Sequence, residues 1–480
     1  MNALVPTPVP SPSAPSPSGP SLPEPPGWGL TPERLAAVGH ALVPIGITLG
    51  CLLVVWLALG AYLARRHPLA FWYGYGFWFL RLRMGRTWRR IALNADLTAT
   101  DRPTSGQLGP LLVKGQPIRP VVPLLIKIRP RRYGAIAVVA MHPGQTPQPF
   151  IDAADAMAHA WGVHAVRVVP AGRRGWVNLT ILRADPLKDT SMAAPAPARP
   201  PADLGAAVPD DLRAEVGNRE DGHRWAIDLV VFPHWLITGA TQSGKSTLIN
   251  AAVARWAGRP IALVGIDCKG GMELAPLLPR LSALACDRAE AAHVLSQLVD
   301  EAQHRMALCR RHRVRSIWQL PEELRPVPVI VIVDEIAELY LVASREEKEA
   351  ALLATTSLLR LAQLGAALAI HLIVAGQRVG SDLGSGVTAL RAQLGGRICL
   401  KVNDPETADM TLGDLYPDAV EAAQQIGPAE KGVAITTADE FGWIRARSIR
   451  FTNDALDEVV DATRDLTPKL PGLDPPADDI

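Results

Sequence analysis

Cysteine is scarce in this chain, and neither sign of charge is in excess. The 480 residues include five cysteines, and no two of them form a Cys-x-x-Cys pair. This distribution excludes a zinc knuckle or a disulfide framework and is typical of a reducing compartment. The formal net charge is only +2. The composition as a whole therefore gives no signal for a polyanionic partner, and any nucleic-acid footprint must be local.

Basic side chains are also missing from two N-terminal stretches. Residues 1–28 contain no Lys or Arg and are rich in Pro and Ser, which predicts a disordered tail because little apolar surface can be buried. Residues 41–63 contain no charged side chain at all. They lie in an apolar run, residues 38–64, long enough to cross about 30 Å of hydrocarbon as a helix. A buried globular helix is seldom apolar on every face, and a cleaved signal peptide has a basic start and a shorter apolar run. We therefore expect a transmembrane helix that is retained as an anchor.

The charges that follow this run predict its orientation. Residues 65–99 form a basic and aromatic juxtamembrane segment, with seven arginines and no acidic residue among them: Arg65, Arg66, Arg81, Arg83, Arg86, Arg89 and Arg90. Because Lys and Arg are enriched on the cytoplasmic side, the C-terminal bulk should be cytoplasmic and the protein a single-pass protein of the cell (inner or plasma) membrane. The aromatic residues 70–80 prefer the headgroup region and either lie in the interface or form a short re-entrant piece. They are too few to span alone, so one crossing is favoured over a hairpin of two.

The remaining chain divides by composition. Residues 100–190 alternate between strand-like and helix-like patterns, which predicts a small α/β domain, and they hold no catalytic constellation. Residues 191–210 are a Pro/Ala linker. Residues 211–452 contain all the motifs described below, and residues 453–480 form an acidic tail.

One segment matches the Gly-x-x-x-x-Gly-Lys-(Ser/Thr) pattern in its required context. The apolar residues 235–238 precede it and a helical pattern follows it. The predicted nucleotide-binding residues are consecutive: Gly239, Ala240, Thr241, Gln242, Ser243, Gly244, Lys245, Ser246 and Thr247. Such a loop closes its backbone N–H groups around phosphate oxygens, while Lys245 reaches the β- and γ-phosphates and Ser246 offers a hydroxyl to Mg²⁺. The cofactors predicted are ATP and Mg²⁺.

A second apolar strand ends in two carboxylates. Residues 327–333 (VPVIVIV) are followed by Asp334 and Glu335, about 90 residues after the P-loop. Alone, this pattern is common at the ends of structural strands, but at this spacing it predicts that Asp334 holds the metal and Glu335 polarises the attacking water. The adjacent Glu favours an additional-strand ATPase over a simple GTPase or kinase.

Further strand-like runs complete a doubly wound, mostly parallel α/β sheet of the RecA-like P-loop NTPase type. They are residues 261–266, 369–375 and 397–402, and residues 432–437 are expected to add an edge. Because polar residues at the carboxyl ends of parallel strands face the ligand, Gln377 is a candidate sensor of the γ-phosphate or of the water. The alternative is an ordinary loop amide.

An ordered series of segments within residues 216–452 resembles the FtsK/SpoIIIE translocase domain, which TraB-type conjugation proteins share. The segments are GIDCKGGMEL, EAQHRMALCRRHRVRSI, VIVIVDEIAEL and LLRLAQLGAALAIHLIVAGQR. The resemblance implies a homohexameric ring around double-stranded DNA that couples ATP hydrolysis to translocation, usually from a membrane anchor. Residues 100–188 resemble, more weakly, the smaller domain that builds one face of such a ring.

The resemblance also implies an arginine that reaches the γ-phosphate of the neighbouring subunit. Arg397 and Arg360 are the candidates, with Arg378 third, and each could instead be an ordinary surface cation. Gln242 stands where the family often has Gly, and Gly-Gln-Arg-Val replaces Thr-Gln-Arg-Pro, which is closer to the conjugation branch. The segment after Thr452 is too short for a winged-helix module, so the ring itself or a separate DNA-recognition partner would choose the DNA.

The sequence therefore predicts a membrane-anchored DNA translocase, most plausibly in conjugative transfer. One alternative is a chromosome-partitioning translocase at cell division. A secretion-system ATPase that moves protein is another, and the single P-loop disfavours it. A membrane scaffold with a decayed nucleotide site is disfavoured because Lys245, Ser246, Asp334 and Glu335 are all present.

Overall fold

The computed structural model describes residues 32–100, 120–171, 173–188, 207–342, 344–413, 417–438 and 442–476. The predicted disordered tail and most of the Pro/Ala linker lie outside these residues. Two compact units are present, Met1–Leu80 and Arg81–Ile480. The finer domain limits expected from the sequence stay predictions.

The first unit is helical. Helix α1 (Pro32–Arg66) contains a 24-residue apolar stretch, Val43–Arg66, of which only 6% is buried, as expected for a segment that crosses a membrane. A short helix, α2 (Pro68–Phe71), and a π-helical turn, η1 (Trp72–Gly76), follow it. The Tyr75 hydroxyl donates a hydrogen bond to the Trp56 carbonyl at 3.2 Å, and the two rings lie 4.7 Å apart. The aromatic segment is therefore helical and contacts α1.

A second stretch, Glu347–Leu368, is also long and apolar enough to be a candidate span, but 44% of it is buried. It overlaps helix α10 (Arg345–Leu364), whose Leu358 and Leu361 are fully buried in the core of the second unit. Helix α10 is therefore a core helix of the second unit.

The second unit begins within helix α3 (Phe77–Asn94). A small antiparallel sheet follows, in the order β3-β4-β6-β5, with strands Leu124–Arg131, Gly134–Ala140, Trp176–Leu182 and Ala165–Pro170. Helices α5 (Gln148–Asp152) and α6 (Ala154–Trp161) contribute the buried side chains Phe150, Met157 and Trp161. The indole N–H of Trp161 on α6 donates to the Thr87 hydroxyl of α3 at 3.1 Å, which connects these two helices. Strands β1 (Ala99–Thr100) and β2 (Pro120–Val121) form a separate pair.

A ten-stranded sheet organises the rest of the second unit, in the order β11-β10-β12-β13-β9-β14-β15-β16-β7-β8. The parallel strands are β9 (His234–Thr238), β10 (Ala262–Ile266), β11 (Ala283–Ala285), β12 (Val329–Val333), β13 (Ile370–Gly376) and β14 (Gly396–Leu400). The antiparallel strands are β15 (Val433–Thr437), β16 (Trp443–Ser448), β7 (Arg213–Arg219) and β8 (Arg224–Asp228). The expected α/β class is therefore present. Residues 432–437 do not form an edge, because β15 pairs with both β14 and β16.

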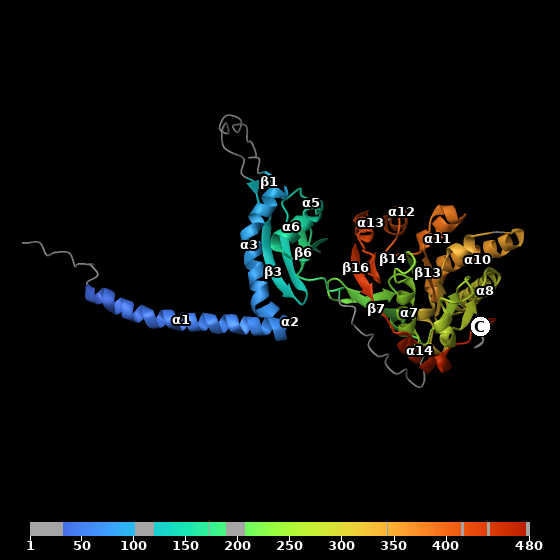
Figure 1. Ribbon diagram of the computed structural model, residues 1–480. Coiled ribbons are helices and arrows are strands. Elements are labelled where there is room, and N and C mark those ends of the chain that lie inside the picture. The colour runs from blue at the N-terminus through green and yellow to red at the C-terminus, as the bar shows by residue number, and fades with distance from the viewer. Residues whose placement is uncertain are drawn as a thin grey trace, which may run out of the picture. The chain divides into compact units, whose positions relative to one another are not determined.

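Apolar side chains on both faces of the strands build two cores. Along β12, Val329, Val331 and Val333 face one core, and Ile330 and Ile332 face the other, as the two-residue period of a strand requires. Helices α8 (Arg288–His312) and α10 lie together on the first side (Figure 1), and α7 (Lys245–Trp256) and α14 (Asn453–Ala462) on the second.

Shorter helices connect these elements. The α-helices are α9 (Ala337–Tyr340), α11 (Val387–Gln393), α12 (Pro405–Ala408) and α13 (Pro417–Gln424). The 3₁₀ turns are η2 (Pro209–Leu212), η3 (Ala275–Arg280), η4 (Ile317–Gln319), η5 (Glu322–Leu324), η6 (Gly365–Leu368), η7 (Ser381–Leu383) and η9 (Arg464–Leu466), and η8 (Asp409–Gly413) is π-helical.

Candidate nucleotide-binding site

The loop between β9 and α7 requires its glycines. A Cβ atom on Gly239 would lie 2.4 Å from the Ser243 hydroxyl oxygen. Gly244 has a φ of +109°, and its Cβ would lie 2.7 Å from the backbone nitrogen of Gly432. A side chain at either position would displace the loop. Glycine at both positions therefore allows the tight turn that a phosphate-binding backbone needs.

Neighbouring strands hold the loop through backbone hydrogen bonds. Ala240 donates to the Lys401 carbonyl at 2.9 Å, and Gly432 donates to the Ser243 carbonyl at 2.8 Å. Helix α7 starts at Lys245 and has no acidic residue in its first turn. Its N-terminus therefore adds a positive partial charge beside the loop, which favours an anionic ligand.

Lys245 connects the P-loop to the end of β12. Its Nζ donates to the Asp334 carbonyl at 2.8 Å and lies 3.7 Å from Asp334 Oδ1 and 3.6 Å from Glu335 Oε2. Both carboxylates are almost fully buried. Two residues that the sequence places about 90 positions after the P-loop thus lie directly beside its lysine.

Burial raises the pKa of Asp334 above its usual value, and the negative charges of Asp267 and Glu273 raise it further, whereas Lys245 lowers it. Asp334 Oδ1 has no hydrogen-bond donor among the described residues. A buried carboxylate oxygen without a donor is suited to a cation, and oxygen ligands are those that Mg²⁺ prefers. The Ser246 hydroxyl, which donates to Glu273 at 2.8 Å, supplies a second oxygen.

These residues fit Mg²⁺ only together with a nucleotide. The described residues contain no group of three or more His, Cys, Asp or Glu that could hold a metal ion alone. A cation at Ser246 and Asp334 would therefore need phosphate oxygens and water to complete its six ligands.

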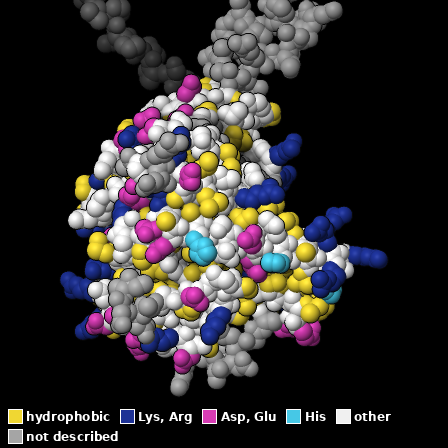
Figure 2. Space-filling model, turned by 90° about the vertical axis from the view of Figure 1, so that its right-hand side faces the viewer, with side chains coloured by type: hydrophobic (Ala, Val, Ile, Leu, Met, Phe, Trp, Pro, Cys, Tyr) yellow, Lys and Arg dark blue, Asp and Glu magenta, His cyan; other side chains and the backbone are white. Residues whose placement is uncertain are grey.

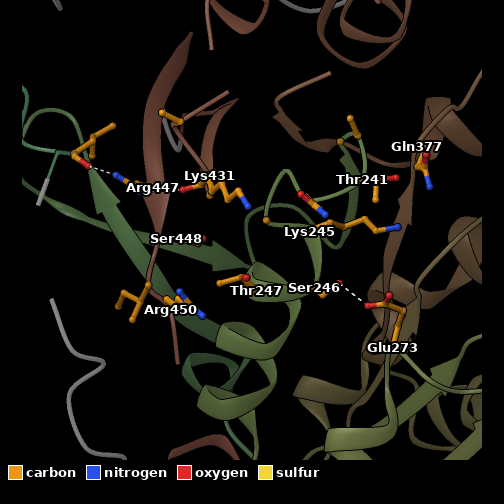
Figure 3. A pocket seen from close by; sticks show the side chains of 18 of the residues that line it. Thr241, Lys245, Ser246, Thr247, Glu273, Gln377, Lys431, Arg447, Ser448 and Arg450 are labelled. Atoms are coloured by element: carbon orange, nitrogen blue, oxygen red, sulfur yellow. Dashed lines mark hydrogen bonds between the residues drawn. The ribbon is translucent and has the colours of Figure 1, made fainter. Parts of the chain in front are cut away.

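Gln377 follows β13 and lines the same pocket. Its backbone N–H donates to Glu335 Oε1 at 3.2 Å, and its side chain is exposed. Figure 3 shows Gln377 on the same side of the pocket as the end of the Lys245 side chain. The proximity to Glu335 fits the predicted role as a sensor, which stays a prediction.

The structure separates the three candidate arginines. Arg397 is buried on β14 and donates from Nη2 to the Arg391 carbonyl at 2.6 Å, so it faces the interior of its own subunit. Arg360 is exposed near the C-terminal end of α10. Because α10 runs back from the end of β12 to the start of β13, Arg360 lies toward the amino ends of the parallel strands, away from the P-loop. Arg378 is exposed beside Gln377 at the nucleotide edge. Which of them acts on a neighbouring subunit stays a prediction.

A pocket of about 660 Å³ extends from the P-loop to residues that the sequence analysis missed. Its opposite wall carries Lys431, Arg447, Ser448 and Arg450, and Figure 3 shows them on the far side of Lys245 from Gln377. Arg447 donates from Nη1 to the Leu187 carbonyl at 2.7 Å. No local pattern marks these residues, because their position depends on β15 and β16 pairing beside β14.

Two further residues at the site come from the segment after β10. Lys269 Nζ lies 3.7 Å from Glu335 Oε2, and Glu273 accepts the Ser246 hydroxyl. The GIDCKGGMEL resemblance marked this segment without assigning them a role.

Comparisons with known proteins agree with this geometry. The profile of the actinomycete conjugal transfer protein N-terminal domain matches residues 57–183, and that of the FtsK/SpoIIIE family matches residues 208–323 and 317–381. The transfer protein TraSA of Streptomyces ambofaciens is 40% identical over 362 residues, which cover 73% of this chain and 84% of TraSA. A sporulation regulatory protein of Streptomyces azureus is 47% identical over 246 residues, which cover 51% of this chain and 80% of that protein.

A solved structure shows the same fold. The pCW3 conjugation coupling protein TcpA, in its monomer form with ATPγS, aligns with a TM-score of 0.50 and 18% identity. The alignment covers 71% of this chain and 93% of that chain.

Proposed function

Because the chain belongs to the FtsK/SpoIIIE family, and specifically resembles actinomycete conjugal transfer proteins over most of its length, we propose that this ATPase moves double-stranded DNA during conjugation from a membrane anchor. The observation that carries the proposal is the convergence of Lys245 with Asp334 and Glu335 at the P-loop.

The chain's own residues suggest how hydrolysis proceeds. Lys245 now lies between two carboxylates, and it would turn toward the β- and γ-phosphate oxygens when a nucleotide enters. Glu335 would then be free to polarise a water and accept its proton, while the Gln377 amide orients that water. Bound at Ser246 and Asp334, Mg²⁺ would supply charge neutralisation on the phosphates.

Coupling to DNA is proposed from the family and from local charge. Figure 2 shows Lys and Arg side chains at both margins of one face, with more of them on the right, and acidic side chains scattered among them. With a net charge of only +2, the chain would bind duplex through such local groups. Phosphate contacts would make binding weaken steeply with salt and depend little on base sequence.

The assembly is proposed to be a homohexamer around the duplex, in which an arginine of one subunit contacts the nucleotide of the next. Helix α1 would cross the cell (inner or plasma) membrane once, with the motor region in the cytoplasm, since the arginines that follow Val43–Arg66 have no acidic residue among them.

ATP hydrolysis by the full chain in detergent, with and without long duplex DNA, tests the proposal. We expect duplex to stimulate turnover, and we expect Lys245→Ala and Glu335→Gln each to lower the stimulated rate on the order of 100-fold or more. Glu335→Gln should still bind a fluorescent ATP analogue, because Glu335 acts on the water. Lys469→Ala, an exposed lysine outside the pocket, should behave as wild type.

Other outcomes would redirect the assignment. Turnover stimulated by a secreted peptide and not by duplex would indicate protein export. Duplex-stimulated turnover, combined with normal plasmid transfer in a strain that lacks the protein, would favour chromosome partitioning. Absence of nucleotide binding by the wild-type chain would overturn the proposal.

A further inference from the structure

We call residues 267–274, the segment between β10 and η3, the β10 loop. This loop has a defined conformation. Asp267 is buried at its start, and its Oδ2 accepts the backbone N–H of Glu273 at 2.8 Å. Gly270 and Gly271 have φ values of +81° and +76°, which let the chain turn back on itself. The turn delivers the Glu273 side chain to the first turn of α7.

The Ser246 hydroxyl donates its proton to Glu273 Oε2 at 2.8 Å. A serine hydroxyl has one hydrogen and two lone pairs. When it ligates a cation, a lone pair must face the ion and the hydrogen must point elsewhere. An acceptor on the side away from the ion therefore fixes the rotamer in which a lone pair faces the metal position.

The negative charge of Glu273 also acts at the position expected for Mg²⁺. Glu273 and Asp334 line the same pocket, so a cation bound at Asp334 would also lie in the field of the Glu273 carboxylate. Glu273 is exposed in the pocket that also contains the P-loop. A carboxylate placed there opposes the binding of a nucleotide that carries no metal and favours a bound divalent cation.

We propose that Glu273 is a positioning residue that orients the Ser246 hydroxyl as a ligand for Mg²⁺ and so makes the site select the magnesium complex of the nucleotide. This rests on the proposed function of the site as a Mg²⁺-dependent ATPase. It assigns Glu273 no contact with the reacting phosphate.

The test measures dissociation constants of a fluorescent ATP analogue for the full chain in detergent, once with excess Mg²⁺ and once with EDTA. The dissociation constant in EDTA divided by the dissociation constant with Mg²⁺ is called the magnesium advantage. Glu273→Ala should lower this ratio about 10–100-fold, the usual cost of removing a group that orients a metal ligand. In EDTA the same variant should bind the analogue as tightly as wild type or more tightly, since a negative charge has been removed.

Three further variants sharpen the reading. Glu273→Gln keeps an acceptor oxygen and should retain more of the magnesium advantage than Glu273→Ala. Met272→Ala, in the same loop with a side chain 76% exposed, should leave both constants unchanged. In a Ser246→Ala background, Glu273→Ala should lower the magnesium advantage less than it does in the wild-type chain, because the hydroxyl that Glu273 orients is already gone.

The outcomes separate the possible failures. Equal weakening of binding by Glu273→Ala with Mg²⁺ and with EDTA would show that Glu273 only supports the loop, and unchanged constants would show that it has no part. If the wild-type chain binds the analogue without any magnesium advantage, the proposed site itself fails.

Discussion

At the scale of single residues, Gly244 shows how strictly the nucleotide loop is constrained. It combines a φ of +109° with a Cβ position 2.7 Å from a neighbouring backbone nitrogen. We expect Gly244→Ala to weaken ATP-analogue binding at least about 10-fold, because both strain of roughly 1–3 kcal/mol and displacement of the loop oppose it. Equilibrium binding to the full chain measures the effect.

Gly386 provides the matched control. Its φ is +89°, yet a Cβ there would meet nothing within 4 Å. Gly386→Ala should therefore carry the backbone strain alone and lower the melting temperature slightly, with analogue binding unchanged. If both variants bind alike, the close approach at Gly244 has no functional consequence.

Two buried histidines predict a pH-dependent stability. Burial lowers the pKa of His234 to about 3 and that of His371 to about 4, and Arg305 adds to the lowering at His371. His234 Nδ1 accepts the backbone N–H of Leu372 at 3.1 Å, which requires a neutral ring nitrogen. In the unfolded chain each histidine takes up a proton near the ordinary pKa of 6.5. The contribution to folding stability is therefore complete above that pH and is lost as the pH falls toward about 4.

Thermal melts of the full chain between about pH 7.5 and 5 check this prediction. Each histidine contributes up to about 1.4 kcal/mol per pH unit below its unfolded pKa. His371→Gln should make the dependence shallower, whereas His304→Gln, an exposed residue on α8, should keep the wild-type slope. If the wild-type chain and both variants lose thermal stability equally as the pH falls, the acid sensitivity arises from other groups.

Residue-level predictability differed between the two walls of the pocket. The P-loop is one contiguous string, and the carboxylates follow an unmistakable apolar strand, so both could be predicted from the sequence. Lys431 and Arg447 could not, since they reach the pocket only through the pairing of β15 with β14 and of β16 with β15. The burial of Arg397 was likewise not predicted, although all of β14, on which it lies, is buried.

At the scale of elements, α8 illustrates a helix whose start is encoded locally. Asp287 is its N-cap and accepts the Glu290 backbone N–H at 2.9 Å, while the Glu290 carboxylate accepts the Cys286 N–H at 2.7 Å. Asp287→Ala should cost about 1 kcal/mol of stability, the usual value for a lost N-cap. Asp300→Ala, an exposed site within the same helix, should cost less, and equal losses would argue against the cap.

Five of the six parallel strands were predictable, because both of their faces are buried and they read as continuous apolar runs. The sixth, the three-residue β11, was not predicted. The antiparallel half was less predictable. Strand β16 is only partly buried along most of its length, and β7 contains the polar or charged residues Arg213, Glu215, Asn218 and Arg219, so neither has a strong apolar pattern. The predicted edge at 432–437 became interior for the same reason, since its outer partner gave no signal.

At the scale of the whole molecule, the anchor and the motor region have different chemistry within one chain. Val43–Arg66 exposes apolar side chains along its length, whereas the nucleotide site needs a water-facing pocket. In the proposed arrangement, lipid would cover Val43–Arg66 and the nucleotide pocket would stay open to water. A single crossing would therefore place the two ends of the chain on opposite sides of the membrane, and a hairpin of two crossings would place them on the same side.

Cysteine labelling in intact cells distinguishes these topologies. In a variant lacking the native cysteines, Ser11→Cys should react with a membrane-impermeant maleimide in intact cells. Lys469→Cys should react only after permeabilisation, because arginines flank the C-terminal end of the span and favour the cytoplasm. Protection of both positions in intact cells would mean that both ends are cytoplasmic. The aromatic segment that contacts α1 through Tyr75 would then have to cross the membrane with its neighbours, despite the arginines that follow it.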